Sequence, residues 1–282
     1  MNTENVWLVT GASKGLGLTL VKKLLADGYR VIATSRNVKS LKDEVGGKSE
    51  NFLPLSMSLS DEADVKSVIA EGVVYFGRID VVVNNAGFGQ TGTLEELTAR
   101  EVNDSFAINV FGTLNVIRHV TPYLRRQQSG HVINISSVAG FNGEFPGWGI
   151  YAATKFAIAG MTESYAEEVK EFDIKATVVY PGYFRTDFLS SGSLKVAVNP
   201  IDSYQAARQS EKEHLENING NQLNDPEKAA EIFIELVKLS NPPVHLFLGN
   251  DAYEQAAKKI AALQQQMQEF KELATATEII SA

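Results

Sequence analysis

The stretch YAATK at 151–155 places a phenol and an ammonium group four positions apart. On a helix, residues at i and i+4 lie on the same face, so Tyr151 and Lys155 would be neighbours. A phenol has a pKa of about 10, and a nearby positive charge favours its phenolate form. We therefore expect a proton-transfer pair, with Tyr151 as the acid or base and Lys155 as the group that shifts the pKa of Tyr151 toward neutrality.

A glycine-rich turn, TGASKGLG at 10–17, follows the first apolar run of the chain. Its glycines allow a tight turn and a close approach of the backbone to a phosphate, and the next helix offers its N-terminus to an anion. The spacing differs from the G-x-G-x-x-G pattern, and a glycine turn alone is a weak signal. Its place after the first predicted strand favours a dinucleotide site.

The end of the second apolar run bears on which dinucleotide is bound. An acidic residue there would accept a hydrogen bond from the ribose hydroxyl of NAD. This chain instead has Ser35 followed by Arg36, with Lys14 in the glycine turn. Two cations and a hydroxyl suit a phosphate monoester, so we predict NADP(H), with NAD(H) less favoured. The alternative is that Arg36 and Lys14 simply face solvent.

Alternating apolar and amphipathic segments predict an α/β fold. The apolar runs lie at 6–10, 29–35, 52–57, 79–85, 131–136, 174–180 and 244–248, and helical patterns lie at 16–27, 61–76, about 98–128 and 151–171. Several runs are apolar on both faces, as in strands covered by helices on both sides. We expect one domain, residues 1–282, built on a doubly wound parallel sheet in three α/β/α layers.

Two segments depart from this alternation. Residues 183–224 are polar and lack a clear period, which is typical of a substrate loop or lid. Asp225 and Pro226 then form the natural start of a helix. The tail, about 251–282, has the pattern of an amphipathic helix with a glutamine-rich middle, for which packing or a subunit contact is the expected role.

The composition excludes several kinds of site. The chain has no cysteine, so disulfides, thiol catalysis and thiolate metal sites are excluded. A formal net charge of −8 disfavours a nucleic-acid partner, and the four histidines are too widely spaced to predict a metal site. No apolar stretch approaches the roughly 18 residues that span a bilayer, and the N-terminus lacks a signal-peptide pattern. We expect a cytoplasmic protein without a membrane partner.

Six motifs together carry a resemblance to a known family. TGASKGLG, NNAG at 84–87, FAINVFGT around Asn109, INISS at 133–137, YAATK and PGYFRT at 181–186 follow one another as in the short-chain dehydrogenase/reductases. The resemblance covers about residues 6–187 and the late strand. It implies a Rossmann-like fold and hydride transfer between a nicotinamide and a carbonyl or secondary alcohol.

The resemblance also assigns roles to individual residues. It implies a catalytic set of Asn109, Ser137, Tyr151 and Lys155, in which Ser137 rather than Ser136 holds the substrate oxygen. Asn109 would kink its helix and hold a water in the proton path, and Lys155 would bind the nicotinamide ribose. The cofactor contacts predicted from the turn and the resemblance are Gly11, Ser13, Lys14, Gly15, Leu16, Arg36, Ser58, Leu59, Asn85, Ala86, Gly87, Tyr151, Lys155, Pro181, Gly182, Phe184 and Thr186.

One position departs from the family pattern. An Asp that recognises the adenine amine usually follows the third strand, whereas this chain has Ser58 and Leu59. Adenine recognition would then be weaker or would depend on backbone groups, which puts a direct contact of Ser58 in doubt.

Aromatic residues in three loops predict the character of the substrate. Ser137, Phe88, Phe145, Trp148 and Phe188 are the expected substrate contacts, with Phe141 and Phe184 as further candidates, and they favour a bulky, apolar ketone, aldehyde or secondary alcohol. Arg185 is the candidate for holding a carboxylate.

Other functions and the assembly state stay open. A 3-ketoacyl reductase is the alternative enzyme, although an acidic surface disfavours docking of an acidic carrier protein. An NADP-binding sensor or scaffold without turnover is the alternative from another class. The long helices near 98–128 and 151–171 favour a homodimer or homotetramer.

Overall fold

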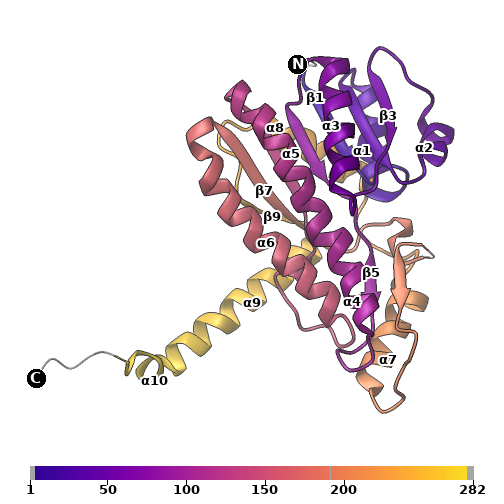
Figure 1. Ribbon diagram of the computed structural model, residues 1–282. Helices are drawn as coiled ribbons and strands as arrows, with labels where there is room; N and C mark the ends of the chain where they lie inside the picture. Colours follow the sequence, from indigo (N-terminus) through magenta and orange to yellow (C-terminus); the bar gives the residue numbers. More distant parts are fainter. Residues whose placement is uncertain (1–3, 191, 278–282) are drawn as a thin grey trace, which may run out of the picture.

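A parallel sheet forms the centre of the molecule (Figure 1). The structure, a computed structural model, describes residues 4–190 and 192–277. The sheet has seven strands in the order β3-β2-β1-β4-β6-β7-β9. The strands are β1 (Val6–Thr10), β2 (Arg30–Ser35), β3 (Phe52–Ser56), β4 (Val81–Asn84), β6 (Gly130–Ile135), β7 (Ile174–Pro181) and β9 (His245–Leu248). The order reverses between β1 and β4, which confirms the doubly wound, Rossmann-like parallel sheet.

Helices cover both faces of this sheet and complete the three layers. One face packs against α1 (Gly15–Ala26), α2 (Val38–Val45) and α8 (Pro226–Lys238). The other face packs against α3 (Glu62–Phe76), α5 (Gly112–Gln127) and α6 (Gly149–Val169). Asp225 caps α8 by accepting from the Glu227 N–H at 2.8 Å, and Pro226 occupies the first turn, as predicted.

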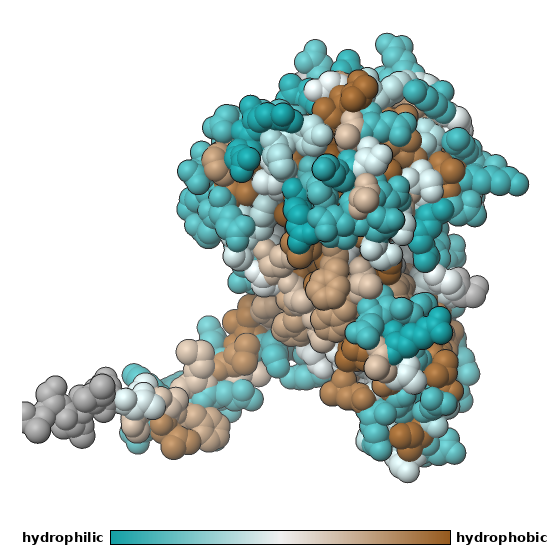
Figure 2. Space-filling model, viewed as in Figure 1, coloured by the Kyte–Doolittle hydropathy of each residue, from teal (hydrophilic) through white to brown (hydrophobic). Residues whose placement is uncertain are grey.

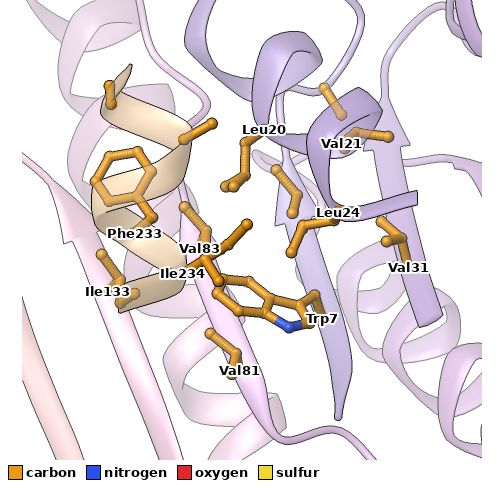
Figure 3. Close-up of a cluster of buried hydrophobic side chains, with 14 of the residues drawn as sticks. Trp7, Leu20, Val21, Leu24, Val31, Val81, Val83, Ile133, Phe233 and Ile234 are labelled. Atoms are coloured by element: carbon orange, nitrogen blue, oxygen red, sulfur yellow. The ribbon is translucent and has the colours of Figure 1, made fainter. Parts of the chain in front are cut away.

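The core on the first face is centred on Trp7 of β1. Figure 3 shows Leu24 of α1 and Ile234 of α8 gathered around the Trp7 indole, which is 1% exposed. Full burial of a large apolar side chain contributes about 1.5–3 kcal/mol, so this cluster holds α1, β1 and α8 together. The glycine turn between β1 and α1 therefore rests on a rigid support.

The predicted helix at about 98–128 is interrupted by a π-helical turn. The segment runs through α4 (Ala99–Phe106), η1 (Ala107–Phe111) and α5, and η1 is the π-helix. Asn109 lies in η1, and its carbonyl accepts from Thr113 Oγ1 at 3.2 Å. A single π-turn inside an α-helix bends it locally and is frequent at functional sites.

The segment 183–224 contains more regular structure than its polar composition predicted. It holds η4 (Asp187–Leu189), β8 (Leu194–Val196), α7 (Gln205–Lys212) and the π-helical η5 (Glu213–Ile218). Strand β8 pairs in parallel with β5 (Gly89–Thr91), which follows β4.

Outside this segment, single 3₁₀ turns lie at η2 (Val138–Gly140) and η3 (Lys170–Phe172).

The C-terminal helices project from the body as an arm (Figure 1). The arm consists of α9 (Asn250–Glu269) and α10 (Lys271–Thr275), and residues 278–282 of the predicted tail lie outside the described residues. Figure 2 shows brown, hydrophobic residues along its length. Of the helices described, none has both the length and the apolar character that membrane crossing requires.

Candidate active site

A cavity of about 740 Å³ opens at the carboxyl ends of the central strands. Its wall includes the glycine turn after β1, the segment 85–88 after β4, the serine pair after β6 and the loop that begins at Pro181 in β7. The cavity therefore lies where the strand order reverses, the position at which doubly wound sheets bind ligands.

The glycine turn packs directly against the loop after β4. Gly11 has a φ of +66°, and a Cβ there would lie 2.7 Å from the Cα of Ala86. Asn85 Nδ2 donates to the carbonyls of Thr10 at 3.0 Å and Gly11 at 3.1 Å. The backbone of the turn is thus in direct contact with the backbone after β4, and no side chain fits at position 11.

The start of α1 offers an anion site to the cavity. Helix α1 has no side-chain cap and no acidic residue in its first turn, so its free N–H groups and dipole favour a phosphate. Lys14 and Arg36 are exposed cations on the same wall. Ser35 Oγ donates to Ser13 Oγ at 3.0 Å beside them. These residues fit a dinucleotide with its phosphates over the turn.

Helix α6 brings Tyr151 and Lys155 to the cavity on one face, and both are buried. Lys155 Nζ donates to the Ile135 carbonyl at 2.9 Å and lies 5.7 Å from the centre of the Tyr151 ring. Burial raises the pKa of Tyr151 to about 12, against a hydrogen bond with the Ser137 side chain. Burial also lowers the pKa of Lys155 to about 8. The expected downward shift of the Tyr151 pKa is therefore not found, because desolvation outweighs the hydrogen bond with Ser137.

The two serines after β6 serve different contacts. Ser136 Oγ donates to the Lys155 carbonyl at 2.8 Å and so fastens β6 to α6. Ser137 Oγ accepts from the Ala139 N–H at 3.2 Å and reaches the Tyr151 phenol. The geometry therefore favours Ser137 over Ser136 as the serine that faces a bound substrate.

Asn109 lies behind the cavity wall and braces it. Its Nδ2 donates to the Phe88 carbonyl at 2.9 Å and to Thr154 Oγ1 at 3.2 Å, and its Oδ1 accepts from the Phe88 N–H at 3.0 Å. Thr154 Oγ1 in turn donates to the Tyr151 carbonyl at 2.8 Å. The π-turn thus connects the loop after β4 to the helix that carries Tyr151.

Aromatic rings form the outer part of the cavity. Trp148 packs edge-on against Tyr151, with ring centres 5.6 Å apart, and Phe188 lies 6.0 Å from Tyr151. Phe145 and Phe88 line the same wall, and Lys195 Nζ lies 4.2 Å from the centre of the Phe88 ring. All five predicted substrate contacts, Ser137 included, border this one cavity.

A family model described as short chain dehydrogenase matches residues 5–196. The chain belongs to this family. It is 35% identical over 274 residues to Oxidoreductase BOA17 of Botryotinia fuckeliana, across 96% of this chain and 98% of that relative. It is 34% identical over 242 residues to a 3-ketodihydrosphingosine reductase of Bacteroides thetaiotaomicron, across 86% of this chain and 87% of that relative.

Solved structures agree with this membership. The crystal structure of a short-chain dehydrogenase from Streptomyces avermitilis matches with a TM-score of 0.89 at 33% identity, covering 97% of this chain and 100% of that one. Other solved structures of the same fold hold NAD or NADP. The protein is therefore an oxidoreductase of the short-chain dehydrogenase family, whose members act on small molecules with a nucleotide cofactor.

Most predicted cofactor contacts of this short-chain dehydrogenase border the cavity. They are Gly11, Ser13, Lys14, Gly15, Leu16, Arg36, Leu59, Asn85, Ala86, Gly87, Tyr151, Lys155, Pro181, Gly182, Phe184 and Thr186. Ser58 is placed outside the wall, because its N–H donates to Asp64 Oδ2 at 2.7 Å and its hydroxyl contacts Ser60. This part of the cavity is therefore bordered by Leu59 rather than by a polar side chain at 58.

Two further aromatic or charged candidates lie elsewhere. Phe141 packs against Tyr180 and Phe247, with ring centres 5.9 Å and 4.9 Å away, and not in the cavity wall. The Arg185 guanidinium donates to the Gln222 carbonyl at 3.0 and 3.1 Å and is likewise outside the wall. Arg185 therefore holds the segment 183–224 together rather than facing a carboxylate.

Several polar residues of the dehydrogenase cavity were missed from the sequence. Tyr183, His214 and Gln222 line it, and all three come from the segment 183–224. Tyr183 follows directly after the PG motif, which was a signal that it belongs near the site. His214 lies in the π-helical η5, so no ordinary helical period placed it.

Proposed function

We propose that the protein is an NADP(H)-dependent oxidoreductase that interconverts a bulky, largely apolar ketone or aldehyde and its alcohol. The observation that carries this proposal is the meeting of Tyr151, Ser137 and Lys155 in the cavity that also contains the glycine turn. A protein that only bound a dinucleotide would have no need of a buried phenol and a buried ammonium at that place.

The buried phenol suits the role of acid in the reducing direction. A bound nicotinamide supplies the hydride in reduction and accepts it in oxidation. Tyr151, with a pKa of about 12, stays protonated at neutral pH and can donate its proton to the oxygen on which negative charge develops. The Ser137 hydroxyl holds that oxygen beside Tyr151.

Lys155 supports the state that follows proton transfer. Its ammonium lies 5.7 Å from the Tyr151 ring centre, so its positive charge stabilises the phenolate left after the proton has moved. Gly87 is a neighbour of Lys155, since a Cβ on Gly87 would lie 3.6 Å from Lys155 Nζ, and this supports a shared role of the two in binding the cofactor ribose. Asn109 keeps these parts in register through its bonds to Phe88 and Thr154.

Charge at the far end of the cavity supports NADP(H) over NAD(H). Lys14 and Arg36 are the cations there, and Ser35 ends β2 where an acidic residue would favour the free ribose hydroxyl. Phosphate monoesters are held well by an arginine fork. The aromatic wall of Phe145, Trp148 and Phe188 supports an apolar substrate.

The deciding experiment is NADPH consumption by the purified protein with a panel of ketones, aldehydes and 3-ketoacyl thioesters of an acyl carrier protein, with NADH, Arg36→Asp and Tyr151→Phe run in parallel. We expect turnover of bulky apolar ketones with NADPH, a loss of at least about a hundredfold in Tyr151→Phe, and a shift toward NADH in Arg36→Asp. NADPH binding without turnover of any substrate would instead support the sensor. Turnover only of acyl-carrier thioesters would support the 3-ketoacyl reductase.

A further inference from the structure

A hydrogen-bonded pair of polar rings, Tyr183 and His214, lies in the wall of the otherwise aromatic substrate region. Tyr183 Oη and His214 Nε2 are 2.9 Å apart, and both residues line the cavity that contains Tyr151. His214 is 7% exposed and packs in a tilted arrangement against Trp148, with ring centres 4.6 Å apart, and Trp148 itself contacts Tyr151. The pair is therefore fixed close to the reacting end of the cavity.

The other nitrogen of His214 determines the direction of this hydrogen bond. His214 Nδ1 lies 2.7 Å from the Ser210 carbonyl, and a carbonyl oxygen can only accept. Burial lowers the pKa of His214, so the imidazole is neutral and carries a single N–H. That N–H is on Nδ1, which leaves Nε2 as an acceptor for the Tyr183 hydroxyl.

The Tyr183 hydroxyl consequently donates its only proton to His214 and can still accept a hydrogen bond. Its proton points at His214, and its oxygen keeps lone pairs for a second partner. The backbone of Tyr183 is held as well, since its N–H donates to Asp251 Oδ2 at 2.7 Å and its carbonyl accepts from Asn224 Nδ2 at 3.0 Å. A rigid phenol of this kind offers an acceptor to hydroxyl or amine groups and offers nothing to a carboxylate or a second carbonyl.

From this geometry we propose that Tyr183, oriented by His214, binds a hydroxyl or amino group that the substrate carries near its reacting carbonyl. The substrate class is thus hydroxy- or amino-ketones with an apolar remainder, and the corresponding diols or amino alcohols, rather than plain hydrocarbon ketones. This inference rests on the proposed reductase function and narrows its substrate. Tyr183 is the binding group, and His214 is a positioning residue that acts through it.

A matched series of aryl ketones tests the proposal. Propiophenone is compared with its α-hydroxy and β-hydroxy derivatives, and butyrophenone with its γ-hydroxy derivative, by kcat/KM with NADPH. We expect the wild type to prefer at least one hydroxylated ketone over its parent. In Tyr183→Phe that preference should fall roughly tenfold, about one hydrogen bond, mainly through KM. In His214→Phe, which keeps a ring against Trp148, the preference should also fall, because the phenol loses its orientation.

The control variant removes the hydroxyl of a buried tyrosine outside the cavity. Tyr165 is buried in α6, contacts Thr121 Oγ1 at 2.8 Å and lies outside the cavity wall, so Tyr165→Phe should leave the preference unchanged. Thermal unfolding and NADPH binding confirm that each variant is folded. An unchanged preference in a folded Tyr183→Phe would overturn the inference while leaving the reductase function intact. If the wild type reduced neither parent ketones nor hydroxylated ones, the proposed function would fail and the inference with it.

Discussion

At the scale of single residues, Lys155 shows a conflict between stability and chemistry. Its side chain is 5% exposed, and its ammonium donates to a single backbone carbonyl, Ile135 O. Burial of a charge without a counter-ion is unfavourable, and the pKa of Lys155 falls to about 8 for that reason. Strained or desolvated groups of this kind are common at catalytic sites, where they are kept for function at the expense of stability.

Replacement of Lys155 by methionine should therefore stabilise the fold while abolishing turnover. The folded pKa lies near 8 and the ordinary value is 10.5, so between these pH values the unfolded chain binds a proton that the folded chain has released. The free energy of unfolding of the wild type thus rises between about pH 8 and pH 10.5. Below this range the full cost of burying the charged Lys155 is present. We expect Lys155→Met to unfold with a free energy up to roughly 3 kcal/mol higher than the wild type at pH 7.

Urea unfolding at pH 7 and again near pH 10.5 checks this prediction. The advantage of Lys155→Met should shrink toward zero at the higher pH, because Lys155 is then neutral in the folded wild type and only about half protonated in the unfolded chain. An advantage of equal size at both pH values would show that packing, and not the buried charge, is the cause.

At the scale of elements, a buried carboxylate fastens the segment 183–224 to the rest of the chain. Glu96 accepts from the N–H groups of Thr93 and Ile201, both at 2.6 Å, and pairs with Arg208 at 3.0 Å. Burial alone would raise the pKa of Glu96, but these donors outweigh it and the pKa is lowered. Together with the β5·β8 pairing, this carboxylate holds α7 and η5, and hence His214, over the cavity.

Glu96→Gln should loosen this element without touching the catalytic residues. An amide cannot pair with Arg208, and loss of one partner of a buried pair costs about 3–5 kcal/mol. We expect faster proteolysis within residues 192–224 and a KM that rises several-fold, with a smaller effect on kcat. Glu62→Gln serves as the matched control, because Glu62 pairs with Arg118 on the exposed surface. A KM that rises equally in both variants would contradict the role given to Glu96.

The same elements show what the sequence could and could not predict. The sheet strands were predictable because runs such as VWLVT at 6–10 are apolar on both faces, and Tyr151 and Lys155 because a helix fixes their spacing. The π-turn at Asn109 depends on side-chain bonds to Phe88, which no local pattern encodes. Strand β8 pairs with β5 from far along the chain, and so His214 could not be placed in the cavity beforehand.

At the scale of the whole molecule, the outer part of the arm, residues 261–277, contributes little to the stability of one chain. Residues 261–277 are all exposed, although Leu263, Met267 and Phe270 are large and apolar. Their spacing by four and three residues, which continues from Ile260, is typical of a helix seam that packs on another helix. The outer part of the arm thus keeps a row of apolar side chains that the rest of the chain does not cover.

Deletion of residues 261–282 should leave the free energy of unfolding within about 1 kcal/mol of the full chain at low protein concentration. The measurement is urea unfolding of both proteins, repeated over a wide range of concentrations. A full-length protein whose midpoint rises with concentration, beside a truncated one whose midpoint does not, would show that the arm stabilises an assembly. A truncated protein with a much lower free energy of unfolding at every concentration would contradict the prediction, because it would mean that the arm packs on its own chain.

The contact of α1 with α8 across Trp7 (Figure 3) also affects how the chain folds during its synthesis. Synthesis proceeds from the N-terminus at about 5–20 residues per second, so the first apolar face waits on the order of tens of seconds for Phe233 and Ile234 to be made. During that interval Leu20 and Leu24 lack the cover that α8 later provides. A nascent chain that has already produced Tyr151 and Lys155 therefore still presents one open half of its core to chaperones.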